Sequence, residues 1–164
     1  MEARLTDKKT FQLTDDGQPL GELHYKSLFS FKAQIKLTNG NTYDIKPVGI
    51  FGTSITVTEG GKEVANLKMN WVGQIVFTFQ EGQEFLFKAK GAFLNKFIIS
   101  NKDDENIILL NPKFEWSKLN CSYNISYDKK PQDILLILLS VYASNYFIAS
   151  MSGHISSGVV VGSV

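Results

Sequence analysis

The chain has 164 residues, of which 43% are hydrophobic and 20% are charged, so it suits one globular domain and is not a disordered chain. Its net charge of +1 excludes the strongly basic surface of a typical nucleic-acid-binding protein. One cysteine and two histidines supply too few ligands for a Cys/His zinc site, and we expect neither a metal site nor a cofactor.

The two ends of the chain differ in composition. Residues 1–30 carry charges throughout and contain no apolar signal-peptide core, so we expect a cytoplasmic protein. Between Asp133 and Val164 the sequence has no charged residue. We interpret residues 1–153 as a single domain that includes a helix at about 132–151, and residues 154–164 as an uncharged tail.

Three related segments follow one another along the chain. At an offset of 44 residues, 11–23 aligns with 55–67 without a gap, and 39–46 falls on 81–88 at a similar offset. A third, more degenerate copy begins at Phe97 and runs to Tyr127. Such a period also describes a propeller blade, but three blades are fewer than the usual number of about four to eight. The repeat therefore favours a closed sheet.

Within each copy, apolar and polar residues alternate with the period of a β-strand. For example, Ala33 and Ile35 point to one face of a strand, while Gln34 and Lys36 point to the other. Residues that tolerate a positive φ separate the alternating runs, and they stand at 16–17, 39–40, 60–61 and 81–82. Each copy yields up to four strands, which predicts an antiparallel sheet of eleven or twelve strands.

The apolar run at 134–151 follows Pro131 and Asp133, which are typical of the start of a helix. A helix that is hydrophobic on every side is enclosed by protein or by lipid. A barrel of eleven or twelve strands has an intermediate bore that a helix about 10–12 Å across would fill. The sequence therefore predicts a mainly β fold, in which a closed antiparallel barrel of about twelve strands encloses the hydrophobic C-terminal helix. The alternative is a membrane anchor.

A helix inside a barrel needs partners for its polar side chains. We expect its small residues to face the nearest wall, and these are Ser140, Ala143 and Ser144. The larger polar residues are expected to bond to groups that point into the barrel, and these are Tyr142, Asn145 and Tyr146.

Together, the three copies, the Gly-x-Phe connectors at 49–51 and 91–93, the turns around Gly61 and Asp104, and the terminal apolar helix resemble the tubby C-terminal-like superfamily. This group includes the LURP-one-related proteins and the phospholipid scramblases. The resemblance covers residues 10 to about 153 and implies a twelve-stranded barrel around a hydrophobic helix. It also implies roles at membranes, because tubby domains bind phosphoinositides and scramblases are associated with calcium and lipid movement.

Neither role transfers residue by residue. The one arginine, Arg4, stands near a terminus that we expect to be frayed, so the cluster of arginine and lysine that the resemblance implies is missing. The acidic residues 103–105 coincide with a predicted turn and lack the spacing of an EF-hand loop, so we interpret them as a solvated hairpin turn.

The sequence contains no P-loop, dinucleotide-binding, nucleophile-elbow or zinc-protease motif. We expect His24 to be an outward, solvated residue and Cys121 to be an inert thiol on the apolar face of its strand. His154 follows the helix, where a cation complements the last carbonyl groups. These residues predict no catalytic site, and we expect that the protein is not an enzyme.

Lysines supply the remaining candidate site. Lys32 and Lys36 project from the outer face of one predicted strand, and Lys88 and Lys90 project from that of another. If these strands are neighbours, the lysines form one basic patch, and each lysine near an anionic bilayer contributes about 1 kcal/mol of binding free energy. The alternative is that they are ordinary solubilising residues.

We therefore expect a non-enzymatic binding module that associates weakly with anionic phospholipid membranes. One alternative is a protein-interaction scaffold that engages a protein partner through exposed strands or through residues 155–164. The other is a membrane protein that is anchored by residues 134–151.

Overall fold

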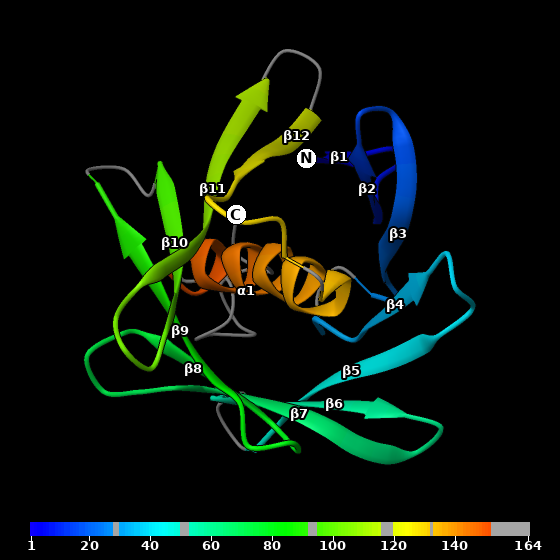
Figure 1. The fold of residues 1–164 in the computed structure, drawn as a ribbon. Coiled ribbons are helices and arrows are strands. Elements are labelled where there is room, and N and C mark those ends of the chain that lie inside the picture. Colours follow the sequence, from blue (N-terminus) through cyan, green and yellow to red (C-terminus); the bar gives the residue numbers. More distant parts are fainter. Residues whose placement is uncertain (28–29, 50–52, 92–94, 116–119, 132, 152–164) are drawn as a thin grey trace, which may run out of the picture.

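The structure is a computed structural model, and it describes residues 1–27, 30–49, 53–91, 95–115, 120–131 and 133–151 (Figure 1). The predicted tail at 154–164, His154, and parts of the connectors at 49–51 and 91–93 lie outside the described residues.

The described part of the chain forms twelve β-strands and one α-helix. The strands are β1 (Glu2–Leu5), β2 (Thr10–Asp15), β3 (Gln18–Tyr25), β4 (Ala33–Leu37), β5 (Thr42–Val48), β6 (Ser54–Glu59), β7 (Lys62–Met69), β8 (Ile75–Phe79), β9 (Glu84–Lys90), β10 (Lys96–Asn101), β11 (Asn106–Glu115) and β12 (Asn120–Ser126). Each strand pairs with the next one along the chain, and β1 also pairs with β12, so the barrel is closed. All of these pairs are antiparallel, which confirms the predicted fold class.

The strand ladders preserve the threefold repeat. The first copy forms β2–β5, the second forms β6–β9, and the third forms β10–β12. The first hairpin of each copy has an irregularity at the same place, between Leu13 and Thr14, between Val57 and Thr58, and between Ile99 and Ser100. The repeat in the sequence is therefore a repeat in the structure.

The fourth strand of the third copy comes from the other end of the chain, because β1 fills the position between β12 and β2. Ala3 pairs with Tyr123 on one side and with Leu13 on the other, and its side chain is fully buried. The expectation that this segment is frayed is wrong, since ladder hydrogen bonds hold both of its edges.

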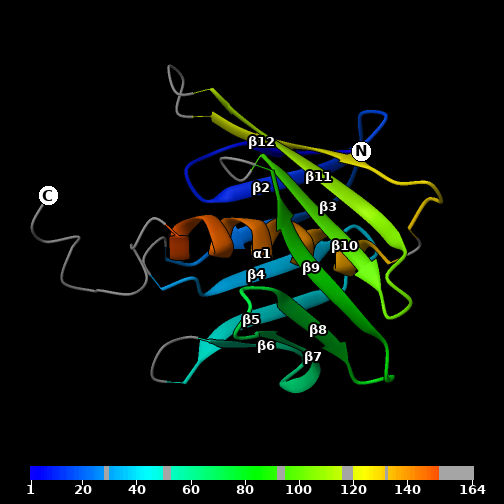
Figure 2. The same ribbon diagram turned by 90° about the vertical axis from the view of Figure 1, so that its left-hand side faces the viewer.

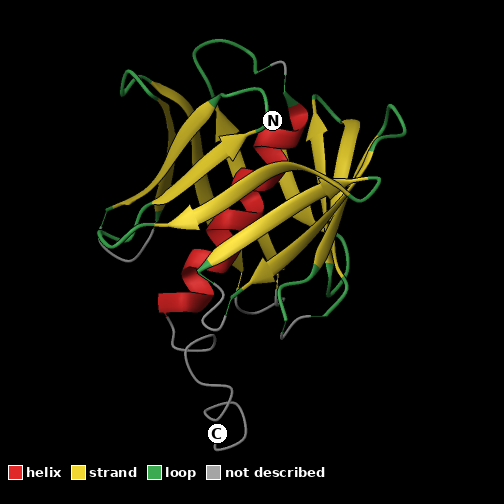
Figure 3. Ribbon diagram, turned by 90° about the horizontal axis from the view of Figure 1, so that it is seen from below, coloured by secondary structure: helices red, strands yellow, loops and turns green. Residues whose placement is uncertain are grey.

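The helix α1 (Ile134–Met151) runs through the interior of the barrel (Figures 1 and 3). Asp133 is its N-cap, and the carboxylate Oδ1 of Asp133 accepts a hydrogen bond of 3.3 Å from the backbone N–H of Leu136. By length and composition this helix is apolar enough to cross a membrane, but 67% of it is buried in the protein. The barrel wall therefore accounts for its apolar composition without a bilayer.

The helix does not lie on the axis of the barrel, since it contacts β3 and β4 most closely. The small residue at this contact is Gly21 on the wall, where an added Cβ would lie 3.1 Å from Cδ1 of Leu138. Elsewhere in the interior, aromatic rings pack against the helix, with Phe147 of α1 at 6.0 Å from Phe87 and 6.2 Å from Phe97 between ring centroids.

Polar side chains of α1 bond to inward groups of the barrel. The hydroxyl of Tyr142 donates to the backbone carbonyl of Phe31 at 2.9 Å. The amide of Asn145 accepts a hydrogen bond from the Tyr123 hydroxyl at 2.6 Å and donates one to the Tyr25 hydroxyl at 2.9 Å. These contacts confirm the predicted bonds of Tyr142 and Asn145. Burial of Tyr25 and Tyr123 raises the pKa of each phenol.

Candidate functional site

The barrel has two chemically different ends. The odd-numbered strands finish at the end where α1 finishes with Met151, and we call this the exit end (Figure 2). The even-numbered strands finish at the opposite end, where α1 begins at Ile134. The helix itself carries no charged residue, so the differences between the ends come from the strands and their connectors.

Exposed apolar side chains gather at the exit end. Within the described ranges, the exposed large hydrophobic residues are Val48, Trp71, Val72, Phe114 and Met151. Each stands in the last part of an odd-numbered strand, in the connector that follows one, or at the last position of α1. Trp71 has an exposed fraction of 97%, which is unusual for an aromatic side chain of this size.

Lysines surround the same end. The exposed lysines near it are Lys8, Lys9, Lys26, Lys32, Lys46, Lys68, Lys90, Lys96 and Lys113. Among the described side chains, the carboxylates here are Asp7 and Asp44. Asp44 accepts a hydrogen bond of 2.6 Å from Lys26, and this contact lowers the pKa of the Asp44 carboxyl. The exit end is therefore strongly cationic.

The opposite end carries most of the acidic residues. Those in its connectors and the adjoining strand ends are Asp15, Asp16, Glu59, Glu63, Glu81, Glu84, Asp103, Asp104, Glu105, Asp128 and Asp133. Lysines lie here as well, and Lys130 forms an ion pair with Asp15 at 2.5 Å that lowers the pKa of that carboxyl. The charges of a nearly neutral chain are thus separated along the barrel axis.

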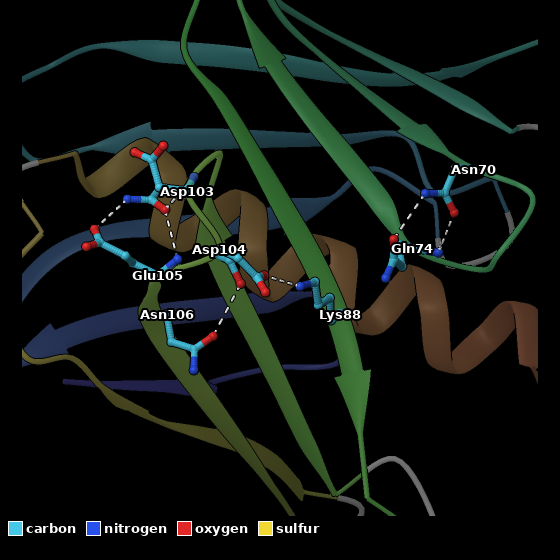
Figure 4. Close-up of polar contacts among 9 residues, drawn as sticks. Asn70, Gln74, Lys88, Asp103, Asp104, Glu105 and Asn106 are labelled. Atoms are coloured by element: carbon cyan, nitrogen blue, oxygen red, sulfur yellow. Dashed lines mark hydrogen bonds and ion pairs between the residues drawn. The ribbon is translucent and has the colours of Figure 1, made fainter.

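The four predicted site lysines do not form one patch. Lys32 precedes β4 and Lys90 ends β9, and both are exposed at the exit end. Lys36 lies toward the opposite end of β4, next to Glu22 of β3 in the ladder. The ammonium of Lys88 forms an ion pair with Asp104 that lowers the pKa of this carboxyl (Figure 4). Because β5 to β8 separate β4 from β9, the four lysines do not share one patch, although Lys32 and Lys90 are both exposed at the exit end.

The acidic residues at 103–105 form a hairpin turn, as expected. The side-chain oxygen of Asn101 accepts hydrogen bonds from the backbone N–H groups of Asp103 and Glu105, at 3.0 Å and 2.9 Å. Asp104 has a φ of 62°, a left-handed conformation that aspartate tolerates in turns. Among the residues that the structure describes, no group of three or more His, Cys, Asp or Glu residues could hold a metal ion.

Two of the residues considered for catalysis, His24 and Cys121, lie in the described part of the chain. His24 is exposed, as predicted, and its Nδ1 lies 2.9 Å from the hydroxyl of Thr10. Cys121 is partly buried beside the core, and burial raises the pKa of its thiol to about 11. At neutral pH this thiol is therefore almost entirely protonated, which makes it a poor nucleophile.

The sequence interpretation missed the exit-end residues, above all Trp71 and the lysines at 46, 68, 96 and 113. Their common position follows from the alternation of connectors between the two ends of an antiparallel barrel, a signal that is present in the sequence once the strand order is known.

No protein-family model, no curated protein and no solved structure gives a match to this chain.

Proposed function

We propose that this protein is a non-enzymatic binding module that associates reversibly with anionic phospholipid membranes through the exit end of its barrel. The observation that carries the proposal is that exposed apolar side chains and lysines occupy the same end, while the acidic residues gather at the other.

Separation of positive and negative charge between the two ends orients the protein at an anionic surface, although its net charge is close to zero. Each lysine close to an anionic surface contributes about 1 kcal/mol of binding free energy, and this attraction decays over a Debye length of about 8 Å at physiological salt. The acidic end is repelled from the same surface. The cationic end is therefore expected to face the membrane, with the acidic end directed away from it.

The distribution of the lysines favours a membrane over a protein partner. They follow the whole circumference of the exit end, from Lys8 beside β1 to Lys113 on β11. A flat and extended anionic surface can contact such a ring at many points at once. The cytoplasmic leaflet of a cell membrane is a surface of this kind, and we place the protein there.

Membership of the tubby C-terminal-like superfamily stays a prediction. It is supported by the architecture, because the resemblance implies a twelve-stranded barrel around a hydrophobic helix and the described chain has that arrangement.

Cosedimentation with lipid vesicles tests the proposed function. The protein is expected to bind vesicles that contain phosphatidylserine at low salt, to bind them less at high salt, and to leave pure phosphatidylcholine vesicles unbound. Absence of binding to the anionic vesicles at low salt would exclude this function.

Two matched variants test the assignment to the exit end. One replaces four exit-end lysines with glutamine, namely Lys32, Lys68, Lys90 and Lys96. The control makes the same change at four lysines nearer the opposite end, namely Lys36, Lys62, Lys102 and Lys129. The first is expected to weaken binding about a hundredfold or more, while the control binds nearly as the wild type does. Equal losses in both variants would contradict the assignment.

A further inference from the structure

Four hairpin turns of the barrel share one backbone arrangement. They span 37–41, 70–74, 79–83 and 101–105, and in each the N–H of the first residue donates to the carbonyl of the fifth. The N–H of the fourth residue donates to the carbonyl of the first. The fourth residue has a positive φ in every case, and these residues are Gly40, Gly73, Gly82 and Asp104. The backbone therefore constrains the fourth position of the turn and leaves the second and third free.

Two of these turns also share their side-chain contacts (Figure 4). In turn 70–74, the side-chain oxygen of Asn70 accepts hydrogen bonds from the N–H groups of Val72 and Gln74, at 3.1 Å and 2.9 Å. Asn101 makes the same two bonds in turn 101–105. The amide of each asparagine also donates to the side chain of the fifth residue, at 3.2 Å to Gln74 and 2.9 Å to Glu105. The two turns thus form an internal comparison.

The second and third residues differ according to the end of the barrel. The turns at 37–41, 79–83 and 101–105 follow even-numbered strands and lie at the opposite end, where these positions hold Thr-Asn, Gln-Glu and Lys-Asp. Turn 70–74 follows β7 at the exit end, and its tip holds Trp71 and Val72, with exposed fractions of 97% and 60%. Since the same turn forms with a polar tip, its geometry does not require Trp71.

We propose that Trp71 and Val72 form a preformed membrane anchor, which inserts into the interfacial layer of an anionic bilayer when the exit end binds. The inference rests on the proposed function and specifies which residues enter the lipid. Tryptophan prefers the boundary between lipid headgroups and acyl chains, because its ring is apolar and its indole N–H can still bond to polar groups.

The surroundings of the tip suit insertion. The bonds of Asn70 already fix the turn, so little conformational entropy is lost when the tip enters the lipid. Lys68 is exposed at the end of β7, two residues before the turn, where its ammonium can reach the headgroups. The anchor thus adds an apolar contribution to the binding free energy, beside the electrostatic attraction of the exit-end lysines. Salt does not screen this apolar contribution.

Tryptophan fluorescence tests the anchor directly. The chain has two tryptophans, so the variant Trp116→Phe leaves Trp71 as the only one. With phosphatidylserine vesicles that contain brominated lipid, we expect the emission of Trp71 to shift to shorter wavelength and to be quenched. Cosedimentation without a shift or quenching would overturn the anchor and leave the proposed function intact, whereas absence of cosedimentation would overturn both.

An exchange of turn tips provides a matched control. The double variant Trp71→Lys, Val72→Asp gives turn 70–74 the tip of turn 101–105 and leaves the net charge unchanged. It is expected to fold with an unchanged circular dichroism spectrum. Its affinity for anionic vesicles is expected to fall by about tenfold. The mirror variant, Lys102→Trp, Asp103→Val, places the same tip at the acidic end and is expected to bind as the wild type does. The inference would be contradicted if the variant at 71–72 bound anionic vesicles as the wild type does. It would also be contradicted if the variant at 102–103 gained as much affinity as the variant at 71–72 lost.

Discussion

Replacement of Gly21 with alanine is expected to lower the free energy of unfolding by about 1–3 kcal/mol, although it adds only one methyl group. A Cβ at this position would lie 2.8 Å from the backbone carbonyl oxygen of Lys36 and 3.1 Å from Cδ1 of Leu138. The leucine can change its rotamer, but the carbonyl belongs to the β3–β4 ladder and cannot move freely. The close approach of α1 to this wall therefore depends on the absence of a side chain at Gly21.

The second copy of the repeat supplies the control. Ala65 on β7 corresponds to Gly21 at the offset of 44 residues, and its methyl group is buried in the barrel with an exposed fraction of 1%. Ala65→Gly is expected to cost about 1 kcal/mol through lost burial and added chain entropy. Denaturant unfolding followed by circular dichroism measures both changes. Unfolding of Gly21→Ala at the wild-type midpoint, or above it, would show that α1 does not need this glycine.

Replacement of Asn145 with leucine is expected to cost about 2–5 kcal/mol, because it leaves two buried hydroxyl groups without their partner. Asn145 bridges Tyr25 and Tyr123, which have exposed fractions of 5% and 0%. The bridge joins α1 to β3 and to β12. Its loss is therefore expected to loosen the helix within the barrel.

A cycle of variants separates the lost hydrogen bonds from a simple packing defect. When Tyr25→Phe and Tyr123→Phe are added to Asn145→Leu, no orphaned hydroxyl remains, and much of the lost stability is expected to return. Denaturant midpoints of the single, double and triple variants give the coupling energy. A triple variant less stable than Asn145→Leu alone would indicate that shape, and not hydrogen bonding, is what Asn145 contributes.

The barrel and its helix could be predicted because their signals are local or repeated. Alternation in segments such as 33–37 identified strands, glycines such as Gly61 marked the turns between them, and the apolar run at 134–151 required an enclosure. The strand β1 was harder to identify. It has four residues, two of them charged, and only its pairing with β2 and β12 explains why Ala3 is buried.

The position of the candidate site could not be read in the same way. Alternation shows that Lys36 and Lys88 point outward, but it does not show where a residue stands along the barrel axis or around its circumference. Those coordinates depend on the strand order and on the direction of each strand. With both known, Lys36 separates from Lys32 and Lys90, while Lys88 is set apart by its ion pair with Asp104.

The strongest signal that the sequence holds for the site lies in its connectors. Every second connector of an antiparallel barrel emerges at the same end. One set includes the polar segments 16–17, 38–41, 60–61, 80–83 and 102–105, and the alternate set includes Trp71 and Val72. Grouping connectors by end, in place of reading them along the chain, reveals this difference.

The orientation of the bound protein tests the central claim most directly. In a Cys121→Ser background, Val48→Cys places a fluorescent label at the exit end, and Gln80→Cys places one at the opposite end. On phosphatidylserine vesicles that contain a nitroxide lipid, the label at position 48 is expected to be quenched and the label at position 80 to remain bright, with recovery at high salt. Stronger quenching at position 80, or equal quenching at both, would contradict the proposal that the cationic, apolar end of the barrel faces the membrane.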